Sequence, residues 1–231
     1  MSGKPVNTGF YGKIPSRGDF VQRGLPREFV RVWDEWLVAR IRQSQLSLAE
    51  GWQEAFMTAP LWRFYLTAGL CGHESVCGVV LPSVDRVGRT FPLVLCRMEA
   101  ISLAEALSQP VMPWFEAVEV LAFDVLEELM EPESIARRLQ ESESLFVPPP
   151  QSGKMVRFPI DSRSLPLSRM TTAALLAQVG DAVRGLSVWW SDGSQCVEPS
   201  VLWCRGMPAA DAFSSMLVGQ WSRFGCEQGN S

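Results

Sequence analysis

Three strand-like runs follow one another with only short glycine-containing turns between them, and this arrangement restricts the fold more than any other feature. The runs cover Trp62–Ala68, Val76–Leu81 and Phe91–Met98. Strands that short turns connect pair antiparallel, because a parallel pair needs a long crossover. The sequence therefore predicts an antiparallel meander. Apolar and polar residues alternate in the first run, which predicts a half-buried strand, whereas the other two contain the continuous apolar stretches of central strands.

Helical patterns lie on both sides of the meander in the sequence. The clearest begins at Pro26, after which apolar residues recur at the spacing of one helix face. Ser102 and Glu105 form a capping box, which predicts a helix start after the meander. Further helices are predicted over a segment that includes Trp52 and Phe56 and ends at Pro60, over Pro113–Met130 with Leu129 on its apolar face, and over Pro132–Leu139, Thr171–Val183 and Pro208–Phe224.

The remaining strands complete the predicted sheet. Residues 9–14 form a short first strand, and Leu186–Ser191 and Val201–Arg205 form a later pair. Neighbouring strand residues face opposite ways, so we expect one ring of Trp189-Trp190 in the core and the other over the sheet edge. The predicted fold is α/β, with a mixed, largely antiparallel β-sheet covered by helices as a three-layer sandwich.

The chain length suits one domain over residues 1–231. Within this domain, residues 140–169 are rich in Pro and Ser and predict a long loop or connection.

Composition excludes several classes of function. The net charge of -4 and the pI near 5.2 argue against a nucleic-acid partner. The N-terminus has no apolar signal region, and charged residues interrupt the most apolar long stretch, Val111–Leu129, so neither secretion nor membrane insertion is expected. The six cysteines lie at irregular spacings without a C-x-x-C pair, which predicts reduced thiols packed as small hydrophobes. These features together predict a cytoplasmic protein.

Two segments, GFYGKIPSRGDFV at Gly9–Val21 and VVLPSVDRVGRTFP at Val79–Pro92, combine turn residues with charged and aromatic ones. This mixture predicts backbone that turns tightly beside the core while holding charged side chains in place, as functional loops do. Their complementary charges predict that the loops lie side by side, with Arg17 or Arg89 paired to Asp85 or Asp19. The candidate partner-binding or structural residues are Lys13, Ser16, Arg17, Asp19, Ser83, Asp85, Arg86 and Arg89.

The chemistry that these residues could carry leaves alternatives open. His73 is the single histidine and lies in a predicted turn, so we expect it to be exposed, and no cluster of ligands predicts a metal or a cofactor. Asp19 and Asp85 could act as acid and base of a small hydrolase in a pocket between the two loops. A phosphate-binding enzyme is a related possibility, because arginine forks suit phosphate; its cations would be Lys13, Arg17, Arg86 and Arg89.

The same two segments resemble the signatures of the TagF family of type VI secretion-associated proteins. The first is followed by Gly24-Leu25-Pro26 and Trp33-Asp34-Glu35-Trp36-Leu37, and the second is preceded by Ala59-Pro60-Leu61-Trp62-Arg63-Phe64. Val188–Ser194 and Gly206-Met207-Pro208 resemble the family's tail, so the resemblance spans nearly the whole chain.

The resemblance implies a cytoplasmic protein that is not an enzyme. It implies a post-translational repressor of type VI secretion, which acts by binding the forkhead-associated scaffold protein of the secretion system. It supplies no catalytic residues, no metal and no cofactor. Whether the signature residues contact the partner or hold the fold is left open by the sequence.

Overall fold

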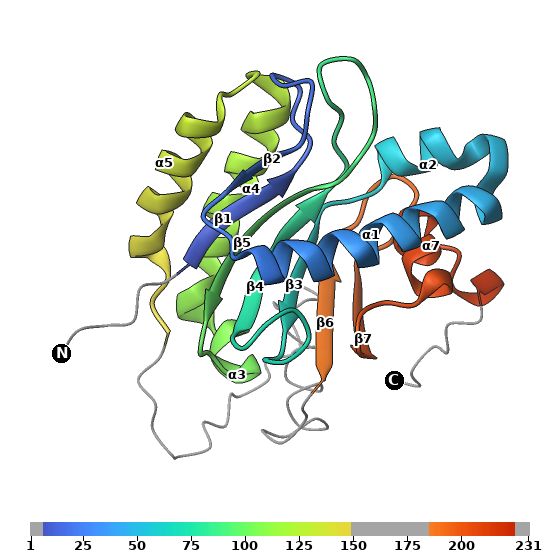
Figure 1. Cartoon of the computed structure of the whole chain (residues 1–231). Helices are drawn as coiled ribbons and strands as arrows, with labels where there is room; N and C mark the ends of the chain where they lie inside the picture. The colour runs from blue at the N-terminus through green and yellow to red at the C-terminus, as the bar shows by residue number, and fades with distance from the viewer. Residues whose placement is uncertain (1–6, 149–184, 225–231) are drawn as a thin grey trace.

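The computed structural model of the chain describes residues 7–148 and 185–224. Seven strands form one sheet in the order β2-β1-β5-β4-β3-β6-β7, and each pair of neighbours is antiparallel (Figure 1). The predicted α/β class with a largely antiparallel sheet is confirmed. The strands are β1 (Asn7–Gly12), β2 (Val21–Arg23), β3 (Trp62–Leu66), β4 (Ser75–Leu81), β5 (Leu93–Glu99), β6 (Leu186–Ser191) and β7 (Ser200–Arg205).

Helices contribute apolar side chains to a separate core on each face of the sheet. One core contains residues from α1, α2 and α7, and the other contains residues from α3, α4 and α5. In Figure 1, α1 crosses one face of the sheet while α4 and α5 lie behind it. The helices are α1 (Arg27–Leu48), α2 (Trp52–Thr58), α3 (Leu103–Ala106), α4 (Met112–Glu127), α5 (Pro132–Ser142) and α7 (Ala210–Val218).

The sequence pattern of α1 explains how its core forms. Pro26 is the N-cap residue, in extended conformation, and the buried Phe29, Trp33 and Leu37 follow at four-residue spacing on one face of the helix. The Trp33 ring lies 5.0 Å from that of Phe64 on β3 and 6.0 Å from that of Trp189 on β6. These aromatic contacts attach α1 to the middle of the sheet.

Two predictions about the strands are wrong. Strand β3 is covered on both faces, because Tyr65 is buried and donates a hydrogen bond from its hydroxyl to the Ile101 carbonyl oxygen at 2.8 Å. Trp189 and Trp190 do face opposite ways, but both rings are buried in the two cores. Trp190 does not lie over the sheet edge, because β7 continues the sheet beyond β6.

Two predicted helices end earlier than their apolar patterns suggested. Helix α4 stops at Glu127, and Leu129 is 59% exposed with a φ of 52°, so it does not belong to the buried face. The last helix stops at Val218, where Gly219 provides a left-handed C-cap. Of the predicted connection 140–169, the first three residues end α5, and residues from 149 lie outside the described ranges, as does the predicted helix Thr171–Val183.

The order of the strands places two distant loops together. Strand β1 runs antiparallel to β5, with Tyr11 opposite Val94, so the end of β1 lies beside the start of β5. The loop that follows β1 (residues 13–20) therefore meets the loop that precedes β5 (residues 82–92). Both loops lie at the upper edge of the sheet in Figure 1.

Candidate functional site

Direct hydrogen bonds join the β1–β2 loop (13–20) to the β4–β5 loop (82–92). The buried Ser83 hydroxyl donates to the Lys13 carbonyl oxygen at 2.7 Å, and the Arg86 backbone N–H donates to the Arg17 carbonyl oxygen at 2.8 Å. The Arg89 guanidinium donates to the Gly18 carbonyl oxygen. The two loops therefore form one structural unit, which we call the apex.

The buried carboxylate of Asp85 organises the apex. Its Oδ1 accepts hydrogen bonds from the backbone N–H groups of Val87 at 3.0 Å and Arg89 at 2.9 Å. Its Oδ2 lies 2.7 Å from Arg89 Nε and 3.0 Å from Lys13 Nζ. The Asp85 side chain thus fixes the tip of its own loop and links it to the other loop.

This environment also sets the charge state of Asp85. Burial alone would raise the pKa of the carboxyl. The hydrogen bonds from the Arg89 backbone, the Lys13 ammonium, the Arg89 guanidinium and the Val87 backbone outweigh burial, and they hold the pKa well below its usual range. Asp85 is therefore a permanent anion at neutral pH, paired with Lys13 and Arg89.

Gly12 permits the close approach of β1 to β5 at the base of the apex. Its φ is +142°, and a Cβ built on it would lie 2.2 Å from the Pro92 carbonyl oxygen. Only glycine accommodates both this backbone conformation and this spacing. The glycine before Lys13 is thus required by the way in which the two loops meet.

A third segment, the turn between α4 and α5, supports the apex from the side. The Ser16 hydroxyl donates to the Met130 carbonyl oxygen at 2.7 Å, and the Arg17 guanidinium pairs with Glu131. This segment was not predicted from the sequence, because the apolar pattern of Pro113–Met130 includes Leu129 and Met130 in a helix. Pro132 disfavours helical backbone only in the residue before it, Glu131, so it does not exclude Leu129 and Met130 from the helix.

The outer surface of the apex combines arginines with apolar side chains. Phe20 is 48% exposed, stacks on the buried Tyr11 ring at 5.7 Å and meets the Phe91 ring edge-on at 4.8 Å. Val87 is 67% exposed at the tip of the β4–β5 loop. We define the apex surface as the exposed residues Arg17, Asp19, Phe20, Arg86, Val87 and Arg89.

The predicted site residues differ in how deeply they are buried. Lys13, Ser83 and Asp85 are buried and hold the loops together, while Ser16 is half-buried against the α4–α5 turn. The remaining four are exposed, and they are Arg17, Asp19, Arg86 and Arg89. The predicted pairing of Arg89 with Asp85 is present, and Arg89 also lies 3.9 Å from Asp19, whereas Arg17 pairs with Glu131 instead.

The geometry bears on the two enzymatic alternatives. Asp19 is fully exposed, while both oxygens of Asp85 are buried and already accept hydrogen bonds, so the two carboxylates do not form an accessible acid–base pair. Three of the four cations proposed for phosphate are already engaged, because Lys13 and Arg89 bind Asp85, and Arg17 binds Glu131.

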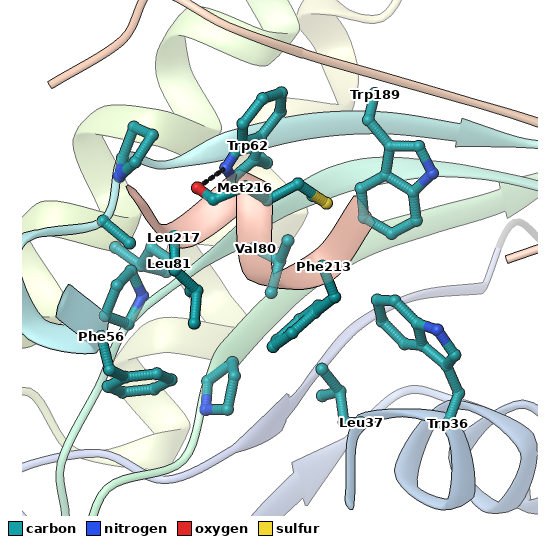
Figure 2. Close-up of a pocket in the computed structure, with 14 residues that line it drawn as sticks. Trp36, Leu37, Phe56, Trp62, Val80, Leu81, Trp189, Phe213, Met216 and Leu217 are labelled. Carbon is teal, nitrogen blue, oxygen red and sulfur yellow. Dashed lines mark hydrogen bonds between the residues drawn. The ribbon is translucent and has the colours of Figure 1, made fainter. Parts of the chain in front are cut away.

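An apolar cavity lies where α1, α2 and α7 meet the sheet (Figure 2). The Trp62 indole donates to the Met216 carbonyl oxygen at 3.2 Å on one side, and Trp36 and Phe213 lie on the other. Its volume of about 40 Å³ is far below the roughly 300–1,000 Å³ of typical ligand pockets. No titratable side chain lines this cavity, so we assign no ligand or chemistry to it.

The histidine and the cysteines considered in the sequence do not belong to the apex. His73 is exposed in the turn before β4. Cys71, Cys77 and Cys96 are buried free thiols, as expected, whereas Cys196 is exposed and Cys204 is half-buried. Within residues 7–148 and 185–224, no three His, Cys, Asp or Glu side chains are arranged to hold a metal ion, and no helix is long and apolar enough to cross a membrane.

Two comparisons with known proteins found matches to this chain, one to a family and one to a solved structure. Residues 9–142 match the family described as TagF N-terminal domain, type VI secretion system-associated, and this range includes both apex loops. The crystal structure of PA0076 from Pseudomonas aeruginosa PAO1 is similar, with 39% sequence identity, a TM-score of 0.72, and coverage of 92% of this chain and 94% of that chain. A search of curated proteins found no match.

Proposed function

The chain belongs to the TagF family of type VI secretion-associated proteins, and we propose that it is a cytoplasmic repressor of type VI secretion. It acts after translation by binding the forkhead-associated scaffold protein of the system and keeping that protein from assembly. The apex surface is the part of the chain that docks on the scaffold.

The observation that carries this proposal is the way the apex is built. Buried charged groups hold the two loops in one shape, and that shape presents Phe20, Val87 and the arginines to solvent. Arginines around exposed Phe20 and Val87 have the composition of a protein interface, in which apolar and aromatic anchors lie among oriented charges. A fixed surface of this kind binds with little loss of conformational entropy.

Regulation by binding also agrees with the chemistry of the chain, and we propose that the protein is not an enzyme. A general base must reach a proton on its substrate, whereas Asp85 is enclosed by its partners. A stoichiometric inhibitor needs no general base.

Secretion assays in the native host test the regulatory role. Deletion of the gene is expected to raise the amount of type VI substrate in the culture medium, and overproduction is expected to silence secretion. Levels of the secretion components should be unchanged in both strains, because the proposed step follows translation. Unaltered secretion after deletion and overproduction contradicts the repressor role.

Binding is tested with purified proteins and a matched pair of variants. Val87→Asp changes the apex tip, and Val38→Asp is its control, since Val38 is 51% exposed on α1 and belongs to neither loop. We expect the wild type and Val38→Asp to capture the scaffold at micromolar concentrations, and Val87→Asp to fail. Equal capture by all three proteins would place the interface elsewhere, and capture by none would refute scaffold binding.

A further inference from the structure

We propose that the apex surface recognises a carboxylate on an acidic segment of its protein partner, and that Arg86 is the residue that binds this carboxylate. This inference rests on the proposed function, in which the apex surface docks on the scaffold protein. It adds the chemistry of the contact and the residue that makes it.

Arg86 differs from the other cations of the apex in having no carboxylate partner among the described residues. Arg17 pairs with Glu131, and Arg89 pairs with Asp85 and approaches Asp19. Arg23, on the neighbouring β2, pairs with Glu133 at 3.0 Å. The guanidinium of Arg86 is exposed with its donors available, and a guanidinium binds a carboxylate through two parallel hydrogen bonds.

The backbone under Arg86 is fixed before any partner arrives. Its backbone N–H donates to the Arg17 carbonyl oxygen. The preceding residue, Asp85, donates its backbone N–H to the Arg89 carbonyl oxygen and accepts at its own carbonyl oxygen from the Gly88 N–H. The Asp85 carboxylate stabilises the same turn by accepting hydrogen bonds from the Val87 and Arg89 backbone N–H groups. An arginine on such a rigid turn loses only side-chain freedom on binding, which favours its use as an anchor.

Apolar residues from three separate segments accompany this arginine. Val87 follows it on the tip, Phe20 lies on the facing loop, and Leu129 precedes Met130 on the α4–α5 turn, which contacts the facing loop through Ser16; all three side chains are exposed. Leu129 also has a φ of 52°, which costs a non-glycine residue free energy and is common at functional sites. Apolar contacts around a charged pair exclude water and strengthen it.

The number of available donors decides between a carboxylate and a phosphate. A phosphate dianion is usually held by several cations together, but the arginines next to Arg86 are engaged by Glu131 and Asp85. One unengaged guanidinium matches the single charge and planar shape of one carboxylate. The partner group is therefore an aspartate or glutamate side chain, with apolar neighbours that meet Val87 and Phe20.

Charge reversal at Arg86 and at acidic residues of the scaffold protein tests this contact. The affinity of the purified scaffold protein is measured by calorimetry for the wild type, for Arg86→Glu and Arg86→Lys, and for Arg42→Glu as control. Arg42 is an exposed arginine on α1 without a carboxylate partner among the described residues. Thermal unfolding of each variant checks that the fold is intact.

We expect Arg86→Glu to weaken binding at least about tenfold and Arg86→Lys to weaken it less, while Arg42→Glu binds like the wild type. A panel of scaffold variants, each with one surface Asp or Glu changed to Arg, is then measured against Arg86→Glu. One member of the panel should restore binding to Arg86→Glu while binding the wild type poorly.

The other outcomes separate this inference from the function on which it rests. If wild type and Arg86→Glu bind the scaffold equally, or no panel member restores binding, the carboxylate contact is wrong and scaffold binding stands. If phosphatase treatment of the scaffold abolishes binding, the ligand is a phosphate and the inference is overturned. If the wild type does not bind the scaffold, the proposed function fails and this inference fails with it.

Discussion

Lys13 Nζ and Asp85 Oδ2 lie 3.0 Å apart, and both side chains are almost completely buried although the residues are far apart in the sequence. A buried ion pair is costly to break, because removal of one partner leaves the other as an uncompensated charge. The pair is therefore a determinant of how the two apex loops are held together, and it can be tested separately from the exposed residues.

Variants of this pair should show strong coupling. Lys13→Met leaves the Asp85 anion without its ammonium partner, and Asp85→Asn leaves the Lys13 cation buried, so each is expected to lower the melting temperature clearly. The double variant should lose less stability than the two single losses combined, because it leaves neither Lys13 nor Asp85 as a buried unpaired charge. Chemical denaturation of all four proteins measures the coupling, and simple additivity would show that the pair does not act as a unit.

Asp85→Ala should be more destabilising than Asp85→Asn. Both changes remove the charge, but Asn keeps a side-chain oxygen that can accept from the N–H groups of Val87 and Arg89. Hydrogen exchange of these two amides provides a local readout, with protection expected to persist in Asn and to disappear in Ala. Equal protection in both variants would mean that the turn forms without the carboxylate oxygen.

The stability contributed by Asp85 should depend on pH with a definite sign. Its pKa is lowered by folding, so the folded state binds the proton less readily than the unfolded chain, in which the pKa is about 3.9. The contribution is complete above the unfolded pKa and is lost as the pH falls below it. The difference in unfolding free energy between wild type and Asp85→Asn should hence be constant from pH 7 to pH 5 and shrink toward pH 3. A difference independent of pH would rule out this titration.

Gly12→Ala should destabilise the chain by at least about 2 kcal/mol, because the new Cβ meets the Pro92 backbone and the residue has positive φ. Gly88→Ala is the matched control: Gly88 also has positive φ, at +83°, but a Cβ there meets open space. Its expected cost is only about 1 kcal/mol. Urea denaturation compares the two variants, and similar losses would show that conformation alone, without steric contact, explains Gly12.

Leu129→Gly should separate stability from binding. Glycine relieves the left-handed backbone, so stability is expected to rise by up to about 1 kcal/mol, whereas removal of the exposed side chain is expected to weaken capture of the scaffold protein. Ala49→Gly is the control, since Ala49 has a φ of 48° at the end of α1 and should change stability without changing capture. Unchanged capture by Leu129→Gly would remove Leu129 from the interface.

Local patterns in the sequence predicted the elements of this fold well. Pro26 and the apolar spacing after it located α1, and Ser102 with Glu105 located α3, because capping and periodicity are properties of neighbouring residues. The burial of Tyr65 was not predictable in this way. It depends on a distant hydrogen bond to Ile101, which satisfies the hydroxyl inside the core.

The candidate site was predictable only in outline. Turn chemistry and charge located both loops and the Arg89–Asp85 pair, which is local to one loop. The Lys13–Asp85 pair and the contact of Arg17 with Glu131 follow from the strand order and from the α4–α5 turn. No pattern within either loop distinguishes the arginines that are engaged internally from Arg86.

The pairing of β3 with β6 has a consequence for synthesis on the ribosome. The hydroxyl of Thr67, just after β3, donates a hydrogen bond to the carbonyl oxygen of Leu186, which lies 119 residues later in the chain. At typical translation rates the nascent chain waits roughly 10 s for this partner. During that time one edge of β3, with its tryptophan and phenylalanine side chains, is open to pairing with other chains. Rapid overproduction at high temperature should therefore favour inclusion bodies, and cooling or a chaperone that shields this edge should increase the yield of folded protein.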